Sequence, residues 1–213
     1  ALMFEAIDGT MPAHPWRDAE LETVIEAIAS LHEALTPCPV AEALDTSVRA
    51  RNALNGWRML AEMPTPPDGL DEWSRRHLAR LVEAEVASLR AVDEGDTLVH
   101  GDIRADNVLL ADGHAVFVDW PHASRGSPLW DLVAMAPSVH LEGGPEPEAV
   151  LAKYRLADRL DADATTAIIA GIGGFLTYHA LLPPEPGLPT LRTFQDAQGR
   201  VTRDWLRART GWS

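Results

Sequence analysis

One short stretch of the sequence restricts the possible folds more than any other. It is His100–Leu110, which reads His-Gly-Asp-Ile-Arg-Ala-Asp-Asn-Val-Leu-Leu. Its last residues and the run Ala115–Val118 are short, apolar and largely β-branched, which favours strands. The Asp-Gly pair between these runs, Asp112–Gly113, is typical of a β-hairpin loop. We therefore expect an antiparallel hairpin in which Asn107 lies opposite or nearly opposite Asp119.

The polar residues around this hairpin suit phosphoryl transfer. Facing side chains in a hairpin lie about 5 Å apart, and Mg²⁺ takes oxygen ligands at about 2.1 Å, so Asn107 and Asp119 can share one ion. Asp102 comes five residues before Asn107 and can face the same ion without binding it. Phosphoryl transfer needs a metal that spreads the phosphate charge and a carboxylate that orients the attacking hydroxyl and accepts its proton. Asp102 suits the second task, and Asn107 with Asp119 suits the first.

The pattern His-Gly-Asp-x4-Asn, followed by an apolar strand and then Asp-Trp, resembles the aminoglycoside phosphotransferase and choline kinase-like family, a branch of the protein-kinase-like fold. The resemblance implies that Asp102 is the catalytic base, that Asn107 and Asp119 hold Mg²⁺, and that the phosphate donor is ATP or GTP. It implies a small-molecule hydroxyl as the acceptor, and a role for Gly101 in keeping the loop tight. It also implies that Asp131, in the helical stretch after the hairpin, braces the loop from behind.

Three neighbours of these residues allow more than one role. Arg104 stands where protein kinases place a lysine aimed at the transferred phosphate, which makes it a candidate catalytic residue, although the family varies at this position. Asp106 fits a loop-capping side chain better than a third metal ligand, because aspartate readily accepts backbone N–H groups two residues on. His100 fits a packed, hydrogen-bonded loop histidine better than an acid or a base.

The charge balance excludes some partners. The sequence has 18 basic and 32 acidic residues, a net charge of −14, so we expect no binding to nucleic acid phosphates. An acidic surface favours a cationic acceptor, such as an aminoglycoside or a choline-like amine. The alternative is that acids such as Glu83 and Glu85 only solvate helix faces. The sequence contains no run of about 18 apolar residues, so we expect no membrane span. The single cysteine, Cys38, fits a reducing cytoplasm.

The first residues predict a hinge between two lobes. Residues 1–9 read as a strand that ends in an Asp-Gly turn, and the family places such a strand where its N-terminal lobe joins its C-terminal lobe. By that resemblance, the backbone of Glu5, Ala6 and Ile7 contacts the adenine. Kinase-like enzymes hold the nucleotide phosphates with a lysine on an N-terminal sheet, whereas the only lysine here, Lys153, follows the motif. We therefore expect a fragment without the nucleotide-gripping lobe, inactive in isolation, or else a natural protein that dispenses with that lobe.

The rest of the sequence predicts an α+β, mostly helical fold, in which residues 10–213 form a protein-kinase-like C-terminal lobe around the central catalytic hairpin. Apolar residues at helical spacing, with Pro and Gly as breakers, predict helical regions at about 18–35, 40–63, 70–92, 129–141, 146–159, 162–182 and 190–209. Trp57, Trp73 and Trp205 suggest sugar stacking or amine binding, but burial in the helical core is the expected place for such large aromatic rings.

These observations lead to one main hypothesis and two alternatives. The main hypothesis is an ATP-dependent phosphotransferase that acts on a hydroxyl of a small molecule and uses Mg²⁺. The first alternative is a kinase-like binding or scaffold protein without catalysis, although the retained base and both metal ligands speak against it. The second is a metal-dependent hydrolase built on His100, Asp102 and Asp119, and it needs more ligands than these three residues provide.

Overall fold

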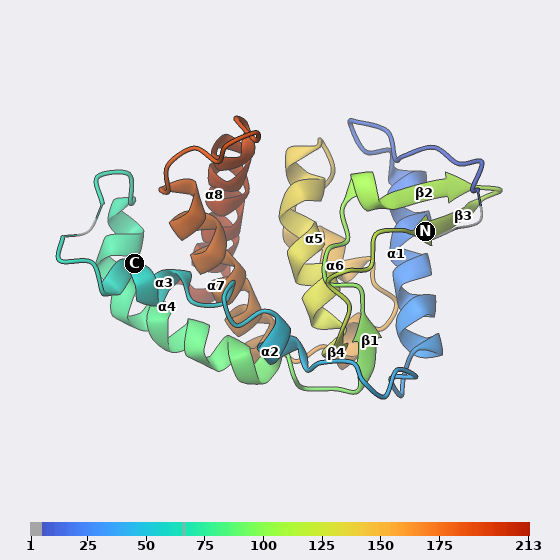
Figure 1. Ribbon diagram of the computed structural model, residues 1–213, viewed down its shortest axis with the longest axis horizontal. Helices are drawn as coiled ribbons and strands as arrows, with labels where there is room; N and C mark the ends of the chain where they lie inside the picture. The colour runs from blue at the N-terminus through green and yellow to red at the C-terminus, as the bar shows by residue number, and fades with distance from the viewer. Residues whose placement is uncertain (1–5, 66) are drawn as a thin grey trace.

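The computed structural model describes residues 6–65 and 67–213. A bundle of helices on one side is joined through α5 (Leu129–Leu141) to a smaller part that contains the hairpin and α1 (Asp18–Ala34) (Figure 1). The bundle consists of α3 (Gly56–Ala61), α4 (Glu72–Ala91), α7 (Ala162–Ala180) and α8 (Leu191–Thr210). The short helices are α2 (Thr46–Arg49), α6 (Pro147–Ala152) and the 3₁₀ turns Ala105–Asn107 and Ala157–Arg159. The expected α+β, mostly helical fold is confirmed.

Two small antiparallel pairs of strands surround the motif. β2 (Val108–Ala111) and β3 (His114–Phe117) form the expected hairpin. β1 (Thr97–Val99) pairs with β4 (Ser124–Gly126), a pairing that the sequence did not predict. Because β1 leads into the loop before the hairpin and β4 follows the hairpin, this second pair fixes where the motif begins and ends.

The segment before α1 lies beside the hairpin. Thr10 exchanges two backbone hydrogen bonds with Leu110 of β2, at 2.8 and 3.0 Å. The strand predicted for residues 1–9 is not found over residues 6–9, because a hydrogen bond of 3.1 Å from Gly9 N–H to Ile7 O turns the chain there. Residues 1–5 lie outside the described part of the chain.

The long helices begin and end close to the expected positions. α4 and α7 each start after an aspartate whose side chain accepts a backbone N–H of the first turn. Asp71 accepts from Ser74 at 3.0 Å, and Asp161 accepts from Ala164 at 2.7 Å. Such caps bind N–H groups that have no partner inside the helix. They explain why these two helices start at Glu72 and Ala162.

The helix predicted for residues 40–63 is wrong over most of its length. Only α2 and α3 form there, and turns occupy residues 50–55 between them. The Asn55-Gly56 pair is typical of a chain reversal. Gly56 also approaches α7 so closely that a Cβ on it would lie 2.0 Å from the Gly174 carbonyl oxygen. The contact between α3 and α7 therefore depends on glycine at position 56.

The helix predicted for residues 146–159 is also interrupted. α6 ends at Ala152, and the chain continues through turns. Tyr154 lies 3.1 Å from His32 of α1, and the Arg155 guanidinium donates a hydrogen bond of 2.7 Å to Glu33, also on α1. These tertiary contacts favour a non-helical backbone after Ala152, and they override the local helix propensity of this segment.

The core of the bundle contains the large aromatic residues. Trp57, Trp73 and Trp205 are buried, as expected, with exposed fractions of 0%, 9% and 6%. The Trp57 indole N–H donates to the Ala170 carbonyl oxygen at 2.7 Å. These rings pack between helices, so they are not available to stack on a sugar.

Glu85 of α4 overturns one expectation about the acidic residues. It was predicted to solvate a helix face, but it is only 2% exposed. Its carboxylate accepts the backbone N–H groups of Trp57 and Arg58 at 2.8 and 3.0 Å, and so caps the start of α3. Burial raises the pKa of Glu85. Glu83, two residues earlier, is exposed as predicted.

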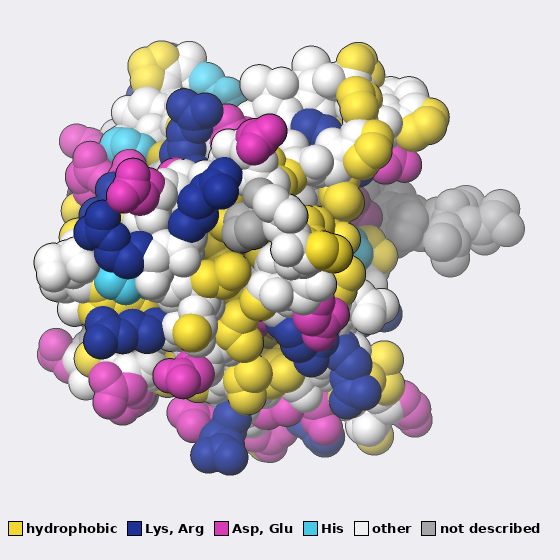
Figure 2. All heavy atoms as spheres, turned by 90° about the vertical axis from the view of Figure 1, so that its left-hand side faces the viewer, with side chains coloured by type: hydrophobic (Ala, Val, Ile, Leu, Met, Phe, Trp, Pro, Cys, Tyr) yellow, Lys and Arg dark blue, Asp and Glu magenta, His cyan; other side chains and the backbone are white. Residues whose placement is uncertain are grey.

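Acids and bases alternate on the outer face of the bundle (Figure 2). On α8, Arg203 and Arg207 both pair with Asp71, at 2.9 and 3.7 Å. At least some of the acidic side chains on this face are therefore paired with arginines. Within residues 6–65 and 67–213, no helix has the length and apolar character that crossing a bilayer requires.

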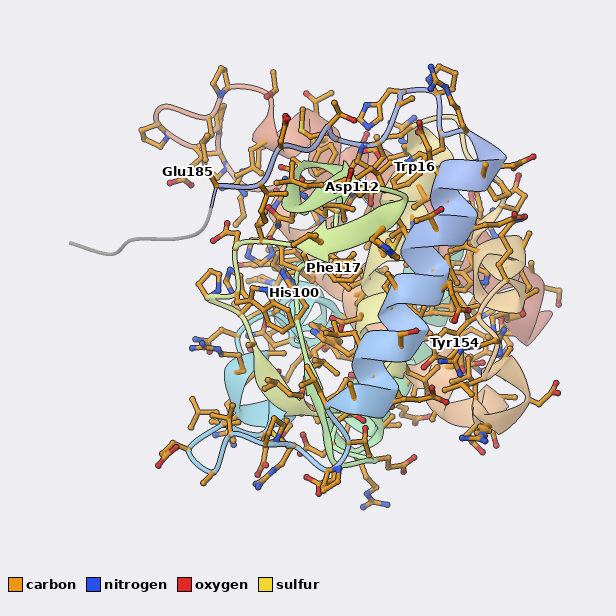
Figure 3. All side chains as sticks on the ribbon, turned by 90° about the vertical axis from the view of Figure 1, so that its right-hand side faces the viewer. Trp16, His100, Asp112, Phe117, Tyr154 and Glu185 are labelled. Atoms are coloured by element: carbon orange, nitrogen blue, oxygen red, sulfur yellow. The ribbon has the colours of Figure 1, made fainter. Side chains whose placement is uncertain are left out.

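Helices α1 and α5 are linked by side chains at both of their ends. Trp16, just before α1, donates its indole N–H to the carboxylate of Glu142, at the end of α5, at 2.8 Å. At the opposite ends, His32 of α1 lies 3.2 Å from Asp131 of α5. Figure 3 shows α1 in front, with Trp16 near its first turn.

Candidate active site

The loop that we expect to be catalytic, His100–Asn107, joins β1 to β2. Gly101 has a φ of 86°, and a Cβ on it would lie 2.5 Å from the His122 carbonyl oxygen. Only glycine adopts such a conformation in so little space without strain. The tight loop expected at Gly101 is present, and it ends in the 3₁₀ turn that carries Asn107 into β2.

Asp131, in the first turn of α5, holds this loop from behind. Its side chain is fully buried, with an exposed fraction of 0%. One carboxylate oxygen accepts the Gly101 N–H at 2.7 Å, and the other accepts the His100 N–H at 2.9 Å. Hydrogen bonds to an ionised acceptor are short and strong. The bracing contact implied by the resemblance is confirmed.

The His100 side chain joins the two halves of the site. Its Nδ1 accepts the Asp102 backbone N–H at 3.2 Å, and its Nε2–H donates to the Val118 carbonyl oxygen at 2.9 Å. The ring is buried and packs against Trp120, with the ring centres 4.6 Å apart. His100 is thus the packed loop histidine that was expected. Because both nitrogens are occupied, it has no lone pair for a metal, and the hydrolase alternative loses one of its three ligands.

Asp102 and Asn107 lie in direct contact. The Asn107 amide Nδ2 donates to the Asp102 carbonyl oxygen at 2.9 Å and to the Asp102 carboxylate at 3.3 Å. Asn107 is 8% exposed, and Asp102 is half-buried. With its N–H groups directed to Asp102, the Asn107 side chain keeps its oxygen as a possible metal ligand. One amide therefore serves both the candidate base and the candidate metal site.

Asp119 lies one position beyond the simplest pairing. The Val118 N–H donates to the Asn107 carbonyl oxygen at 3.0 Å, so Asn107 faces Val118 and Asp119 comes next along the chain. Asp119 is exposed and has a φ of 65°, in the left-handed region. Aspartate enters this region more readily than most residues, in turns and at functional sites. Joint metal binding by Asn107 and Asp119 stays a prediction.

The donor set fits a metal that is shared with a nucleotide. In the described part of the chain, no three or more His, Cys, Asp or Glu side chains are grouped to hold a metal. Mg²⁺ usually keeps several waters and takes one or two protein oxygens together with substrate phosphates. The amide oxygen of Asn107 and the carboxylate of Asp119 suit such an open site.

Arg104 is held by an acid and an aromatic ring. Its Nε donates to Asp106 at 3.0 Å, and its Nη2 bonds the other carboxylate oxygen. Its guanidinium lies 5.6 Å from the ring centre of Phe194, on α8. The ion pair raises the pKa of Arg104 and lowers that of Asp106. Asp106 therefore binds a side chain where a backbone cap was expected, and phosphate contact by Arg104 stays a prediction.

The residues predicted to contact the nucleotide are only partly described. Ala6 and Ile7 lie in the segment before the Thr10 bridge, and Glu5 falls outside the described residues. Lys153, at the end of α6, pairs with Glu22 of α1 at 3.0 Å. The only lysine of the sequence thus forms an ion pair on the surface of α1.

Three residues near the loop were not recognised from the sequence. Phe194 lies far along the chain from Arg104, and no local pattern joins the two. His32 and Tyr154 lie behind Asp131. His32 carried a signal, because it follows Ile28 at helical spacing on the buried face of α1. A histidine on an apolar stripe needs a buried polar partner.

A tight loop braced by a buried aspartate, with an aspartate and an asparagine in contact ahead of a hairpin, is the arrangement that we expected of a kinase-like phosphotransferase. The model of the phosphotransferase enzyme family known as APH matches residues 1–168, and the chain belongs to this family. No curated protein matches the chain at a significant level.

Solved structures agree on the fold. An aminoglycoside phosphotransferase from Alicyclobacillus acidocaldarius is 16% identical, with a TM-score of 0.57 over 97% of this chain and 70% of that one. A choline/ethanolamine kinase family protein from Mesorhizobium loti is 16% identical, with a TM-score of 0.59 over 94% and 68%. A glucosamine kinase bound to glucosamine, ADP and inorganic phosphate is 19% identical, with a TM-score of 0.55 over 91% and 55%. At these identities the similarity establishes the protein-kinase-like fold.

Proposed function

We propose that the intact protein transfers the γ-phosphoryl group of ATP to a hydroxyl of a small molecule. The observation that carries this proposal is the contact between Asp102 and Asn107 on a loop that Asp131 braces. Asp102 is half-buried and in contact with the Asn107 amide, on a loop backbone that donates two hydrogen bonds to Asp131, and this supports a base and a metal ligand at these two positions. Family membership supports the same reaction class.

In the proposed reaction, Asp102 accepts a hydrogen bond from the acceptor hydroxyl and then takes its proton. The hydroxyl oxygen forms a bond to the γ-phosphorus, and the bond from that phosphorus to the bridging oxygen breaks. The nucleoside diphosphate leaves with the electron pair. Positioning of the hydroxyl supplies much of the rate in such reactions. The Asn107 amide, bonded to Asp102, keeps the carboxylate in place for this task.

Asn107 and Asp119 are the residues that we propose to hold Mg²⁺. The ion neutralises charge on the phosphates when it is bound with the nucleotide. ATP is the proposed donor, and GTP serves as its comparison in any assay. A titration with Mn²⁺ in place of Mg²⁺, followed by electron paramagnetic resonance, reports binding directly. Asp119→Asn should weaken binding in the presence of nucleotide, and Asp112→Asn, on the same hairpin, should not.

The acceptor class can be tested with one matched pair of compounds. Glucosamine and glucose differ by an amine, and the excess of acidic residues favours the cationic member of the pair. A screen should follow nucleotide consumption with glucosamine, choline, an aminoglycoside and glucose. Equal rates with glucosamine and glucose would contradict a cationic acceptor. No consumption with any hydroxyl compound, by a protein that binds Mg-ATP, would contradict phosphotransfer itself.

For the isolated chain of residues 1–213 we propose at most weak nucleotide binding and negligible turnover. Lys153 is the only lysine of the sequence, and its ammonium group is paired with Glu22 on α1. A phosphate-gripping lysine is a standard part of kinase-like sites. Isothermal titration with Mg-ATP tests this, and submicromolar affinity would contradict it.

A catalytically inactive binding or scaffold protein is the competing proposal. It predicts nucleotide or partner binding without turnover, and it has no need for a braced base. The contact of Asp102 with Asn107 and the two bonds from Asp131 favour the enzyme. Turnover by the intact protein that is lost in Asp102→Ala would exclude the scaffold.

A further inference from the structure

Behind the catalytic loop, a buried chain of three polar side chains connects α1, α5 and the segment after α6. Asp131 Oδ2 lies 3.2 Å from His32 Nε2, and His32 Nδ1 lies 3.1 Å from the Tyr154 hydroxyl. The exposed fractions of Asp131, His32 and Tyr154 are 0%, 2% and 2%. In Figure 3, His100 and Tyr154 appear on opposite sides of α1. His32, in the last turn of α1, bridges the two sides.

The partners of these groups assign their hydrogens. Burial raises the pKa of Tyr154 to about 12, so its hydroxyl keeps its proton at neutral pH. In the described part of the chain, that hydroxyl has His32 Nδ1 as its hydrogen-bond partner. Nδ1 therefore accepts, and Nε2 carries the hydrogen that it donates to Asp131. The Tyr154 hydroxyl therefore donates to His32, and His32 donates to the Asp131 carboxylate.

The bond from His32 completes the environment of Asp131. The carboxylate also accepts the N–H groups of His100 and Gly101, both from the loop. A buried carboxylate without enough partners is strongly unfavourable. The donor from His32 comes from a separate helix, so it fixes the carboxylate relative to the rest of the protein and not only relative to the loop.

We propose that His32 and Tyr154 are positioning residues for the catalytic loop. Tyr154 orients the His32 ring, His32 fixes the Asp131 carboxylate, and Asp131 fixes the backbone that carries Asp102. The catalytic consequence of this arrangement rests on the proposed phosphotransferase function. The structural part does not, and it can be measured on the chain without any substrate.

Amide hydrogen exchange tests the structural part. His32→Leu should raise the exchange rates of the His100 and Gly101 amides about tenfold or more, relative to amides in α7. The matched control is His77→Leu. His77 is also buried, lies on α4, and has an Nε2 without a partner among the described residues. Equal acceleration of the loop amides in both variants, or none in His32→Leu, would overturn the proposal.

Two conservative variants keep the test open if His32→Leu does not fold. His32→Gln places an N–H donor near the position of Nε2, so it should protect the loop amides better than His32→Asn does. Tyr154→Phe keeps the ring and removes the hydroxyl. Nitrogen chemical shifts should show His32 as the Nε2–H form in the wild type and a mixture of forms in Tyr154→Phe. An Nδ1–H form in the wild type would overturn the assignment.

Kinetics of the intact protein separate the two proposals. His32→Leu should lower kcat with little change in KM, because it displaces the base and leaves the binding surfaces in place. If Asp102→Ala leaves turnover unchanged, the proposed function fails, whereas the exchange result for His32 stands by itself. If the loop amides exchange faster and kcat is unchanged, the positioning role in catalysis is refuted.

Discussion

Asp131 and Asp119 are two acids of the same site with opposite surroundings. Asp131 is fully buried and accepts hydrogen bonds from two loop amides and from His32, whereas Asp119 is exposed and has a left-handed backbone. The oxygens of the Asp131 carboxylate accept hydrogen bonds from within the protein. The Asp119 carboxylate is exposed, so its oxygens are accessible to a bound metal or ligand. The comparison teaches that the rear of the loop maintains structure, whereas the front is where we propose that the chemistry takes place.

The largest effect is expected at the front, for Asp102→Ala. Loss of a positioned base costs about a hundred- to ten-thousand-fold in rate, while the free energy of unfolding should change little because Asp102 is half-buried. Steady-state kinetics of the intact protein and a urea titration measure the two quantities. Asp112→Asn, at the exposed hairpin loop, is the control and should leave both unchanged. A large loss of stability in Asp102→Ala would place Asp102 with the structural residues.

The next largest effect is expected for Asp131, behind the loop. Asp131→Ala leaves the His100 and Gly101 N–H groups without their acceptor, so it should lower the free energy of unfolding by about 1–3 kcal/mol for each group. Asp119→Asn should change it by less than about 0.5 kcal/mol, as is usual for surface positions. Urea titrations of the two variants compare them directly. If Asp131→Ala does not fold, Asp131→Asn, which keeps one acceptor oxygen, replaces it. Similar losses of unfolding free energy at Asp131 and Asp119 would contradict the proposed difference between a structural and a functional acid.

A smaller effect is expected at Glu85, a buried acid far from the chemistry. Glu85→Gln replaces one of its two acceptor oxygens by the NH₂ donor of a carboxamide, which should lower the free energy of unfolding by about 1–3 kcal/mol. Because burial raises the folded-state pKa of Glu85 above 4.5, the folded protein binds that proton more readily than the unfolded chain. The stability of the wild type relative to Glu85→Gln should therefore increase as the pH falls from neutral toward 4.5.

Thermal or urea unfolding at several pH values measures this difference. Glu83→Gln is the matched control, since it makes the same substitution on the exposed side of α4. A difference that shrinks as the pH falls, or an equal response in Glu83→Gln, would contradict the burial argument.

The smallest effect is expected for Arg104→Ala. Its half-exposed pair with Asp106 should contribute less than about 1 kcal/mol to stability. Two of its donor atoms are bound to Asp106, so we expect turnover to fall by less than about a hundredfold, below the usual cost of losing a donor aimed at a transition state. Arg76→Ala, in an exposed pair on α4, is the control. A loss equal to that of Asp102→Ala would make Arg104 an equal partner in catalysis.

Local patterns predicted the hairpin and the long helices, because β-branched runs around an Asp-Gly pair, apolar residues at helical spacing and Pro or Gly breakers all lie in neighbouring residues. The contact between Asp102 and Asn107 also follows from a short spacing. Even the shift of one position at Asp119 lies within what such a loop allows.

Contacts between distant segments could not be read in this way. The pairing of β1 with β4 joins two three-residue strands that carry no clear alternation. Glu85 looked like its exposed neighbour Glu83, and it is buried because α3 and α7 pack against α4. Tyr154 lies in a stretch with a helical pattern. Its hydrogen bond to His32 depends on the packing of that stretch against α1, which no local pattern indicates.

The double attachment of α1 to α5 has a mechanical consequence. Trp16 and Glu142 fasten one pair of ends, and His32 and Asp131 fasten the other, 3.2 Å apart. Two helices that are linked at both ends separate less readily than two helices that are linked at one end only. The two helices should therefore open to solvent together, as one cooperative unit.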